Sequence, residues 1–340
     1  MIYYRPVAMT DAARPAGALT LAGGWCWFDR VEVLERGVSP QLIGVSDLPD
    51  AARARLTAPR PSLAGMSMDR PRIMGILNVT PDSFSDGGRF LDPEAALAQA
   101  RAMVDAGAAI LDVGGESTRP GAAEVAAADE IARTVPVIGA LRGLGVPLSI
   151  DTRKAAVAGA ALAAGAGVVN DVAALGFDPA MAGVVARAGV PVVLMHARGG
   201  PATMQEAPVY GDALLEVYDF LSDRVALAEA AGISRDHIVV DPGIGFGKTV
   251  AHNLTLLRGL SLFHGLGCAV MLGASRKKFI GALSGQAQAD RRVPGSLAVA
   301  MAGVAQGVQI LRVHDVGETQ GALALWRAVV LGDVVLGDGA

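Results

Sequence analysis

The chain has 340 residues, 52% of them hydrophobic and 4% aromatic, and its 29 basic and 33 acidic residues leave a net charge of −4. This length suits one large α/β domain with an extension, or two smaller domains, and the apolar share excludes a disordered chain. Charges of both signs are interspersed, so we expect no nucleic-acid partner, and two cysteines are too few for a disulfide framework and fit a reducing cytoplasm.

Residues 1–70 differ in pattern from the rest of the chain, which we assign to a main domain at 71–335. The N-terminus has no apolar core before Asp11, so we predict no signal peptide. The expected elements are short strands at 18–22 and 25–34, a helix at 47–56 and a Pro-, Ala- and Ser-rich linker at 57–65. Because no pattern in it indicates chemistry, we interpret this part as a small extension of unknown role packed on the main domain.

From residue 72 onward, short apolar runs alternate with Ala-rich segments of helical period. The apolar runs lie at 73–79, 110–113, 147–150, 168–169, 191–195, 238–240, 269–272 and 309–313. Helices are expected at 93–106, 122–144, 153–164, 178–188, 213–231, 251–260, 277–305 (broken) and 315–331. This alternation predicts a parallel sheet covered on both faces, and eight units over about 260 residues match the size of a (β/α)8 TIM barrel.

The uncharged segment at 293–311 is long enough to suggest a membrane span. It contains Pro294, Gln306 and Gln309, however, and arginines flank both of its ends. A buried helix, a glycine turn and a buried strand explain the segment better, so we expect no membrane span.

A polar or charged residue ends or follows every apolar run. These residues are Asn78, Asp112, Asp151, Asn170, His196, Asp241, Ser275 with Lys277, and Arg312 with His314. Burying such groups costs several kcal/mol unless they are paired or bind a ligand. In a TIM barrel all strand ends open on one mouth, where active sites lie, whereas the alternative of a doubly wound open sheet spreads them along an edge. The pattern therefore favours a barrel with one polar mouth.

Several motifs resemble those of the dihydropteroate synthases. The first two are ILNVTPDSFSDGG at 76–88 and DVGGESTRPG at 112–121. Further similar segments are SIDTRK at 149–154, VND at 169–171, parts of 195–205, DPGIGFGKT at 241–249, SRK at 275–277 and RVHD at 312–315. They occur in the family's order from residue 72 to about 330 and leave the extension outside. The resemblance implies condensation of 6-hydroxymethyl-7,8-dihydropterin diphosphate with p-aminobenzoate, giving 7,8-dihydropteroate and diphosphate.

A pterin ring offers a fixed row of hydrogen-bond donors and acceptors, so its pocket needs matching carboxylates and amides. The resemblance assigns the pterin to Asp112, Asp151, Asn170, Met195, Asp241, Phe246, Gly273 and Lys277. The alternative reading is that each Asp or Asn only caps the helix that follows it. A set that converges on one mouth favours the binding site.

A departing diphosphate needs cations and amide donors that neutralise its growing charge. The resemblance assigns it to Asn78, Arg119, Arg312 and His314, with Asn78 contacting Mg²⁺, an ion that prefers oxygen ligands. For p-aminobenzoate it implies Thr118, Arg119, Pro120, Phe246, Ser275 and Lys277. The expected catalytic residues are Asp151, Lys277, Arg312 and His314. We expect diphosphate to leave before the amine attacks, with Asp151 near the developing positive charge.

The glycines of 243–247, followed by Lys248 and Thr249, mimic a nucleotide-binding Walker A loop. That motif requires a glycine where this chain has Pro242, so we interpret the loop as a sharp turn that brings backbone close to a ligand. Two other functions stay open. A pterin-binding methyltransferase would share the pterin residues but not the diphosphate residues, and a silent paralogue would carry degraded motifs. By family resemblance we also expect a homodimer.

Overall fold

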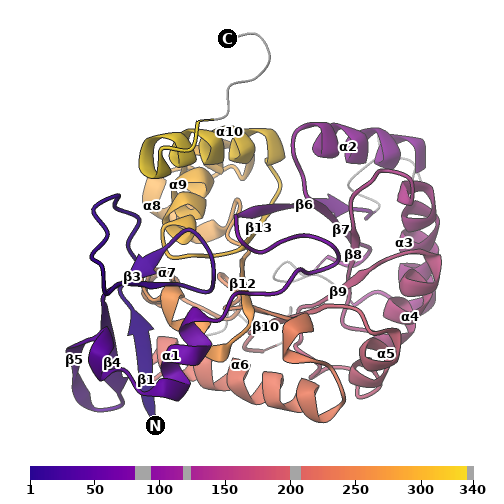
Figure 1. Ribbon diagram of the computed structural model, residues 1–340. Helices are drawn as coiled ribbons and strands as arrows, with labels where there is room; N and C mark the ends of the chain where they lie inside the picture. The colour runs from indigo at the N-terminus through magenta and orange to yellow at the C-terminus, as the bar shows by residue number, and fades with distance from the viewer. Residues whose placement is uncertain (81–92, 118–123, 200–207, 335–340) are drawn as a thin grey trace.

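In the computed structural model, which describes residues 1–80, 93–117, 124–199 and 208–334, eight parallel strands close into a barrel (Figure 1). In chain order they are β6 (Arg72–Asn78), β7 (Ile110–Gly114), β8 (Leu148–Asp151), β9 (Val168–Asp171), β10 (Val192–Met195), β11 (Ile238–Asp241), β12 (Ala269–Leu272) and β13 (Ile310–Val313). Pairing of β13 with β6 closes the ring. The predicted TIM barrel is confirmed, and the alternative of an open doubly wound sheet is wrong.

Helices surround the barrel on its outer side (Figure 1). They are α2 (Pro93–Asp105), α3 (Ala127–Leu141), α4 (Ala155–Ala164), α5 (Met181–Ala188), α6 (Ala213–Ala230), α7 (Val250–Arg258), α8 (Lys278–Ser284), α9 (Val293–Val304) and α10 (Val316–Trp326), which a π-helical turn, η5 (Arg327–Leu331), extends. Short 3-10 turns are η2 (Arg235–His237), η3 (Leu260–Leu266) and η4 (Asp290–Arg292), the last of which lies between α8 and α9. The helix expected at 277–305 is therefore broken, as predicted.

Alternation along each strand divides its side chains between two environments, because residues two apart share one face. Outward-facing residues such as Leu111 and Val113 of β7 belong to the large core between barrel and helices. Inward-facing residues near the strand starts form a second apolar cluster inside the barrel. That cluster comprises Met74, Ile110, Val168, Val193, Val239, Ala269, Met271 and Ile310. Polar inward-facing residues are thereby left for the carboxyl ends of the strands.

The barrel floor, its N-terminal end, is closed by Leu63 and Met68 from the segment that precedes β6. Both side chains are almost fully buried and belong to the inner apolar cluster. Leu63 and Met66 exchange two backbone hydrogen bonds of 2.9 Å each, which fold the segment into a tight turn. In Figure 1 this indigo segment crosses the barrel near its centre. The expected linker at 57–65 thus ends in a plug that completes the barrel core.

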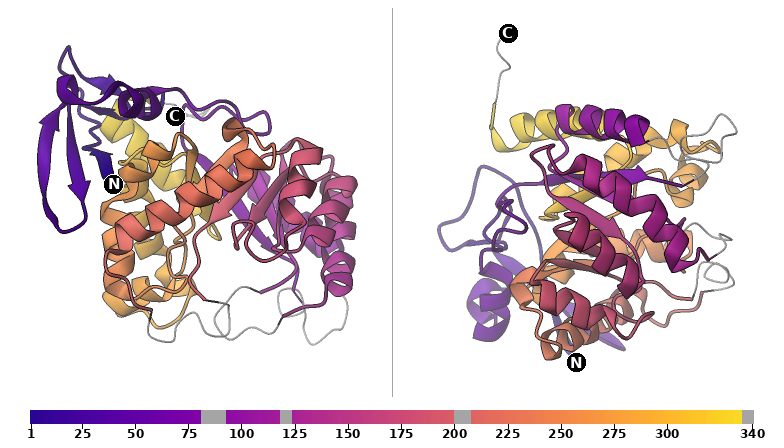
Figure 2. Two further views of the ribbon diagram at one scale, coloured as in Figure 1. Left: turned by 90° about the horizontal axis from the view of Figure 1, so that it is seen from below. Right: turned by 90° about the vertical axis from the view of Figure 1, so that its right-hand side faces the viewer.

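The N-terminal part forms a small lobe beside the helix ring (Figure 2). Its elements are an antiparallel sheet of β1 (Ile2–Pro6), β4 (Arg30–Glu35) and β5 (Val38–Gly44), a two-stranded pair of β2 (Leu19–Thr20) and β3 (Trp27–Phe28), the 3-10 turn η1 (Val45–Asp47) and α1 (Asp50–Thr57). The strand expected at 25–34 is interrupted at Asp29, β1 and β5 were not predicted, and the helix begins only after Pro49.

Hydrogen bonds join this lobe to the barrel helices. The Trp25 indole donates to the carbonyl of Val304 at 2.8 Å, and the Ser261 hydroxyl donates to the carbonyl of Pro6 at 2.8 Å. The buried Arg60 guanidinium donates to the carbonyl of His264 at 2.9 Å. These contacts attach the lobe to η3 and to the end of α9.

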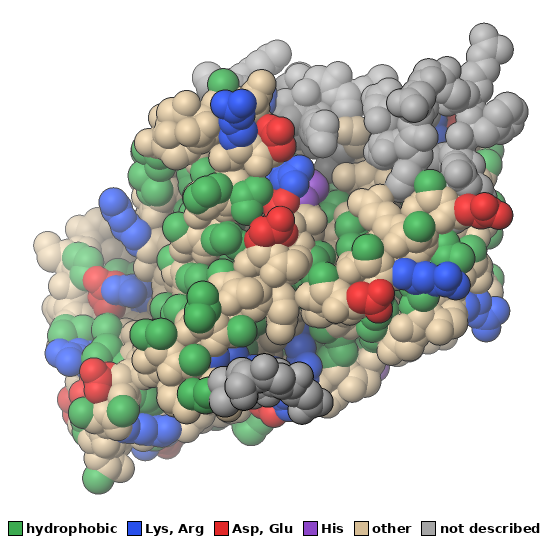
Figure 3. Space-filling view, turned by 90° about the horizontal axis from the view of Figure 1, so that it is seen from above, with side chains coloured by type: hydrophobic (Ala, Val, Ile, Leu, Met, Phe, Trp, Pro, Cys, Tyr) green, Lys and Arg blue, Asp and Glu red, His purple; other side chains and the backbone are tan. Residues whose placement is uncertain are grey.

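The uncharged segment at 293–311 forms α9, a turn at Gly307 with φ +81°, and β13, as predicted. Within the described residues, no helix combines the length and the apolar character needed to cross a membrane. On the face seen in Figure 3, acidic and basic side chains are interspersed among hydrophobic ones, in agreement with the charge pattern of the sequence.

Candidate active site

The pairing register of the barrel brings predicted site residues of three strands, β6, β8 and β9, into one row with Gly114 of β7. Asn78 pairs with Gly114, Gly114 with Asp151, and Asp151 with Asn170. Asp112 lies two residues before Gly114 and shares its inward face. The strand-end residues therefore converge at the carboxyl end of the barrel, as a TIM-barrel active site requires.

Arg312 of β13 spans the barrel and links two of the predicted carboxylates. Its Nε donates to Asp112 Oδ2 at 2.6 Å and its Nη2 donates to Asp151 Oδ2 at 2.7 Å. The side chain of Asp112 is fully buried, and Asn170 donates its amide to the same Oδ2 at 2.9 Å. Arg312, predicted for the diphosphate, thus lies among the predicted pterin carboxylates.

Burial and charge shift the protonation of this cluster in opposite directions. Burial raises the pKa of Asp151 to about 7, although Arg312 acts to lower it, and the neighbouring Asp112 carboxylate raises it further. Burial acts to lower the pKa of Arg312, but Asp112 and Asp151 outweigh it and hold the pKa above its ordinary value. The guanidinium therefore stays charged while Asp151 titrates near neutrality.

Three buried acceptor atoms in this cluster lack a hydrogen-bond partner within the described residues: Oδ1 of Asp112, Asp151 and Asn170. Leaving a buried acceptor unpaired costs about 1–3 kcal/mol, so the mouth is suited to a ligand rich in donors. The helix-capping alternative does not describe these three residues, and even the neighbouring Asp171 accepts from the backbone N–H groups of Ala173 and Leu175 in a turn that precedes α5.

Asp241 contributes a third buried carboxylate from β11. Its Oδ1 accepts from the Gly243 N–H at 2.7 Å, and burial raises its pKa. A Cβ at Gly273 would lie 3.4 Å from Asp241 Oδ2, so glycine there keeps space open beside the carboxylate. Met195 of β10 is buried against the turn that follows β11. Its Cγ lies 3.2 Å from the point where a Cβ at Gly243 would stand.

Lys277 and Phe246 form one wall of the mouth. The Lys277 ammonium lies 3.8 Å from the centroid of the Phe246 ring, in a cation–π contact. A Cβ at Gly245 would lie 3.2 Å from Lys277 Cδ, so this glycine lets the lysine side chain pass close to the loop. A cation stacked on an aromatic ring offers both apolar contact and positive charge to a flat, anionic aromatic ligand.

Ser275 and His314 meet at the ends of β12 and β13. Ser275 Oγ lies 3.0 Å from His314 Nδ1 and accepts from the His314 backbone N–H at 3.2 Å. Burial, followed by the charge of Arg312, lowers the pKa of His314 to about 4. His314, expected beside cations at the diphosphate, is therefore a neutral imidazole in the unliganded protein at neutral pH.

Asn78 ends β6 at the rim of the mouth. Its Oδ1 and Asp151 Oδ2 each lie 3.7 Å from the point where a Cβ at Gly114 would stand. Within the described ranges, no group of three or more His, Cys, Asp or Glu side chains is arranged to hold a metal ion. Three predicted residues for diphosphate or p-aminobenzoate, Thr118, Arg119 and Pro120, lie outside the described residues.

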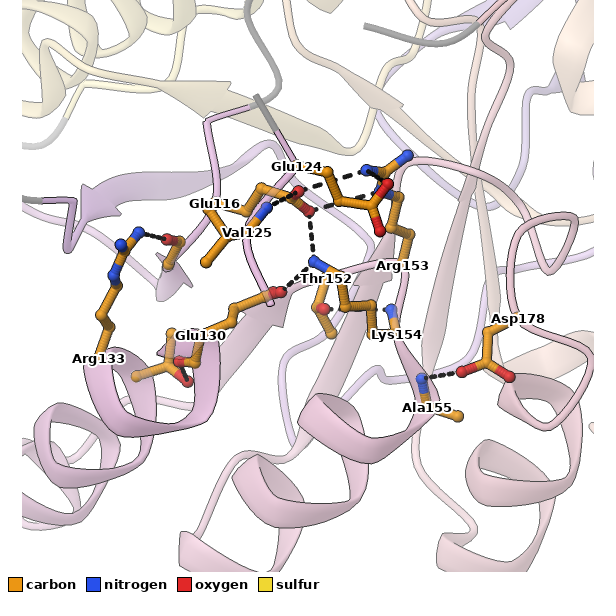
Figure 4. Close-up of polar contacts among 12 residues, drawn as sticks. Glu116, Glu124, Val125, Glu130, Arg133, Thr152, Arg153, Lys154, Ala155 and Asp178 are labelled. Carbon is orange, nitrogen blue, oxygen red and sulfur yellow. Dashed lines mark hydrogen bonds and ion pairs between the residues drawn. The ribbon is translucent and has the colours of Figure 1, made fainter. Parts of the chain in front are cut away.

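Behind the mouth, a buried ion-pair network joins the segments after β7 and β8 (Figure 4). Lys154 Nζ donates to Glu116 Oε2 at 2.9 Å and to Glu130 Oε2 of α3 at 2.7 Å. Glu116 also accepts from the Val125 N–H at 3.0 Å and from Arg153 at 3.3 Å. Glu116, which precedes residues 118–123, therefore contacts the backbone of Val125, which follows them.

The sequence assigned no role to this network, although Glu116 and Lys154 stand in the quoted motifs. Burial acts to raise the pKa of Glu116, but hydrogen bonds from Lys154, Val125 and Arg153 outweigh it and lower the pKa. Ser149 was missed as well, although it pairs in register with Asp112 and is fully buried. All three residues lie in motifs that resemble the family, and this position could have indicated a role, because a polar residue that is buried needs a partner or a ligand.

Comparison with known proteins places the site in context. The chain matches the family described as pterin binding enzyme over residues 74–314. A dihydropteroate synthase of Synechocystis sp. is 48% identical over 263 residues, which cover 76% of this chain and 91% of that protein. The Escherichia coli dihydropteroate synthase is 45% identical over 269 residues, which cover 78% of this chain and 95% of that protein.

Solved structures show the same likeness. The structure of Xanthomonas albilineans dihydropteroate synthase with 4-aminobenzoic acid matches this chain with a TM-score of 0.74 and 48% sequence identity. The match covers 78% of this chain and 96% of the Xanthomonas chain. The same organism's enzyme in complex with 7,8-dihydropteroate gives a TM-score of 0.71 and 45% identity, over 78% and 95% of the two chains.

Proposed function

The chain belongs to the pterin binding enzymes, and from this premise we propose that it acts as a dihydropteroate synthase. It condenses 6-hydroxymethyl-7,8-dihydropterin diphosphate with p-aminobenzoate and releases 7,8-dihydropteroate and diphosphate. The observation that carries this function is the cluster of Asp112, Asn170 and Arg312 at the mouth, with buried acceptor atoms unpaired. Two relatives of this activity are 48% and 45% identical over 76% and 78% of this chain.

We propose that the pterin ring lies against the buried polar cluster. Its amino and ring N–H groups would donate to the unpaired Oδ1 atoms of Asp112 and Asn170, and to Asp241. A substrate without these donors would leave the buried acceptors unpaired, which is a strong basis for discrimination. Gly273 keeps the space beside Asp241 open for the ring.

The bond between the pterin methylene carbon and the diphosphate oxygen breaks first in the proposed mechanism, and diphosphate leaves with the electron pair. The ring system delocalises the resulting positive charge, and the Asp151 carboxylate lies near it. Arg312 keeps a positive charge at neutral pH and is held against Asp151, so it can stabilise the departing anion. The amine of p-aminobenzoate then forms the new carbon–nitrogen bond and loses a proton.

Two further groups are proposed for the diphosphate. Asn78 offers a side-chain oxygen at the rim, and Mg²⁺ commonly combines few protein ligands with waters and substrate phosphate oxygens, so the residues fit this ion. When bound, Mg²⁺ would supply charge neutralisation to the diphosphate. His314, held by Ser275, would contribute a neutral ring N–H as a donor.

The p-aminobenzoate ring is proposed to lie at the wall formed by Phe246 and Lys277, with Ser275 nearby. The Lys277 ammonium borders both substrates and balances negative charge on either one. This pocket distinguishes the synthase from a pterin-binding methyltransferase, which has no use for an aminobenzoate wall. We further propose, on family resemblance, that the protein is a cytoplasmic homodimer, which light scattering and cell fractionation can test.

Purified protein incubated with the pterin diphosphate, radiolabelled p-aminobenzoate and Mg²⁺ tests the function directly. We expect labelled dihydropteroate from the unchanged protein. Asp112→Asn should lower kcat/KM for the pterin diphosphate at least tenfold, because it removes one charged acceptor from the buried cluster. Absence of labelled product from well-folded protein would show that the chain is a silent paralogue.

A further inference from the structure

A buried lysine outside the assigned set lies directly beneath the aminobenzoate wall. Lys248 is 3% exposed and follows the glycine-rich turn that begins after β11. Its ammonium lies 2.8 Å from His196 Nδ1, and it donates to the carbonyls of Gly243 at 2.8 Å and Phe246 at 3.0 Å. Among the described residues, Lys248 forms no ion pair with a carboxylate, so neutral acceptors alone satisfy a buried charge.

The turn that this ammonium supports is tightly confined. Gly243, Gly245 and Gly247 all have positive φ, between +63° and +85°, and this lets the chain fold back on itself. A Cβ at Gly243 would lie only 1.9 Å from the carbonyl oxygen of His196. The carbonyls of Gly243 and Phe246 consequently converge on one buried point, where only a donor can satisfy them.

Protonation of the neighbouring groups fits this arrangement. Burial lowers the pKa of Lys248 to about 7, with Asp241 acting to raise it and Lys277 and Arg198 acting to lower it. Burial, followed by the charge of Lys248, lowers the pKa of His196 to about 2. His196 Nδ1 is therefore free to accept a hydrogen bond at neutral pH.

We propose that Lys248 is a positioning residue for p-aminobenzoate, holding the Phe246 ring against Lys277 through the carbonyls of Gly243 and Phe246. The proposal rests on the function given above. Lys248 is covered by the turn and acts through Phe246, so its removal should disturb one wall of the site. Asp112, Asn170 and Arg312 belong to other strands and keep their own hydrogen bonds, whereas Asp241 contacts the same turn through the Gly243 N–H.

The test compares Lys248→Met, which keeps length but removes the donors, with Lys278→Met, the same change at an exposed lysine beside the site. We expect Lys248→Met to raise KM for p-aminobenzoate at least tenfold, while the Kd for the pterin diphosphate, measured by calorimetry, rises by a clearly smaller factor because only Asp241 of its buried acceptors contacts this turn. Lys278→Met should leave both within twofold. Equal losses for both ligands, or an unchanged KM in folded Lys248→Met, would overturn the proposal.

If Lys248→Met does not fold, the pH dependence of the unchanged protein decides. KM for p-aminobenzoate should rise between pH 6 and 8 as Lys248 loses its proton, and Lys248→Arg, which stays charged, should lack this rise. Asp151 titrates in the same range in both proteins, so the difference between them reports on Lys248. A rise of equal size in both proteins would contradict the proposal. Absence of turnover in the unchanged protein would instead refute the proposed synthase function, so the two failures are distinguishable.

Discussion

Replacement of Lys154 by methionine removes the one cation that Glu116 and Glu130 share. The side chains of these three residues are 8%, 6% and 0% exposed, so neither carboxylate gains water in compensation. Removing one partner of a buried ion pair typically costs about 3–5 kcal/mol. Glu116 retains Arg153 and the Val125 N–H, whereas Glu130 retains no other cation within 4 Å among the described residues.

We therefore expect Lys154→Met to lower the free energy of unfolding by about 3–5 kcal/mol at pH 7, measured by urea denaturation at an unchanged m-value. The loss arises because the fully buried Glu130 carboxylate is left without its partner cation. Lys154→Met combined with Glu130→Gln should recover part of the loss.

Arg133→Met, on helix α3 with Glu130, is the matched control for Lys154→Met. Its guanidinium donates to the Gly115 carbonyl at 2.9 Å, a contact without an ion pair, so about 0.5–1.5 kcal/mol is expected. A loss below about 1 kcal/mol for Lys154→Met, or no recovery of stability in the double variant, would refute the view that the network stabilises through its buried charge.

Two other predictions concern the two ends of the barrel. Because burial raises the folded-state pKa of Asp151 to about 7, the stability linked to its proton is lost as pH rises toward that value. Asp151→Asn should gain about 2 kcal/mol relative to the unchanged protein between pH 5 and 8 in urea denaturation, and a constant difference would contradict this. At the floor, Leu63→Ala should cost about 2–5 kcal/mol by leaving a cavity, yet leave both KM values within twofold. A larger change in KM would show that the floor and the mouth are coupled.

The barrel was predictable because its strands are buried on both faces and appear as apolar runs, which differ from the observed strands by one or two residues at most. The same criterion missed β1 and β5. Most of β5 is exposed and it contains Pro40, so no core imposes an apolar pattern on it.

The site was predictable in part. Asp112, Asp151 and Asn170 were expected together because each lies at or near the carboxyl end of a strand of one ring. The register places Asp151 opposite Asn170, with Asp112 one layer below them on the same inward face. The pairing of Arg312 with the carboxylates was not foreseen, since a motif gives residue types and order but no partners. The burial of Lys154 and Lys248 escaped prediction for a related reason. A lysine is usually exposed, and only the packed structure shows which neighbours enclose it.

The plug at Leu63 and Met68 changes what counts as the catalytic domain. The family match begins at residue 74, within β6, yet the barrel's lowest layer includes two side chains encoded before that point. A gene trimmed to the matched region would leave Met74, Ile110 and Val239 facing water at the bottom of an unsealed cylinder. We therefore expect the smallest part of this chain that folds to begin before residue 74, so that it includes Leu63 and Met68.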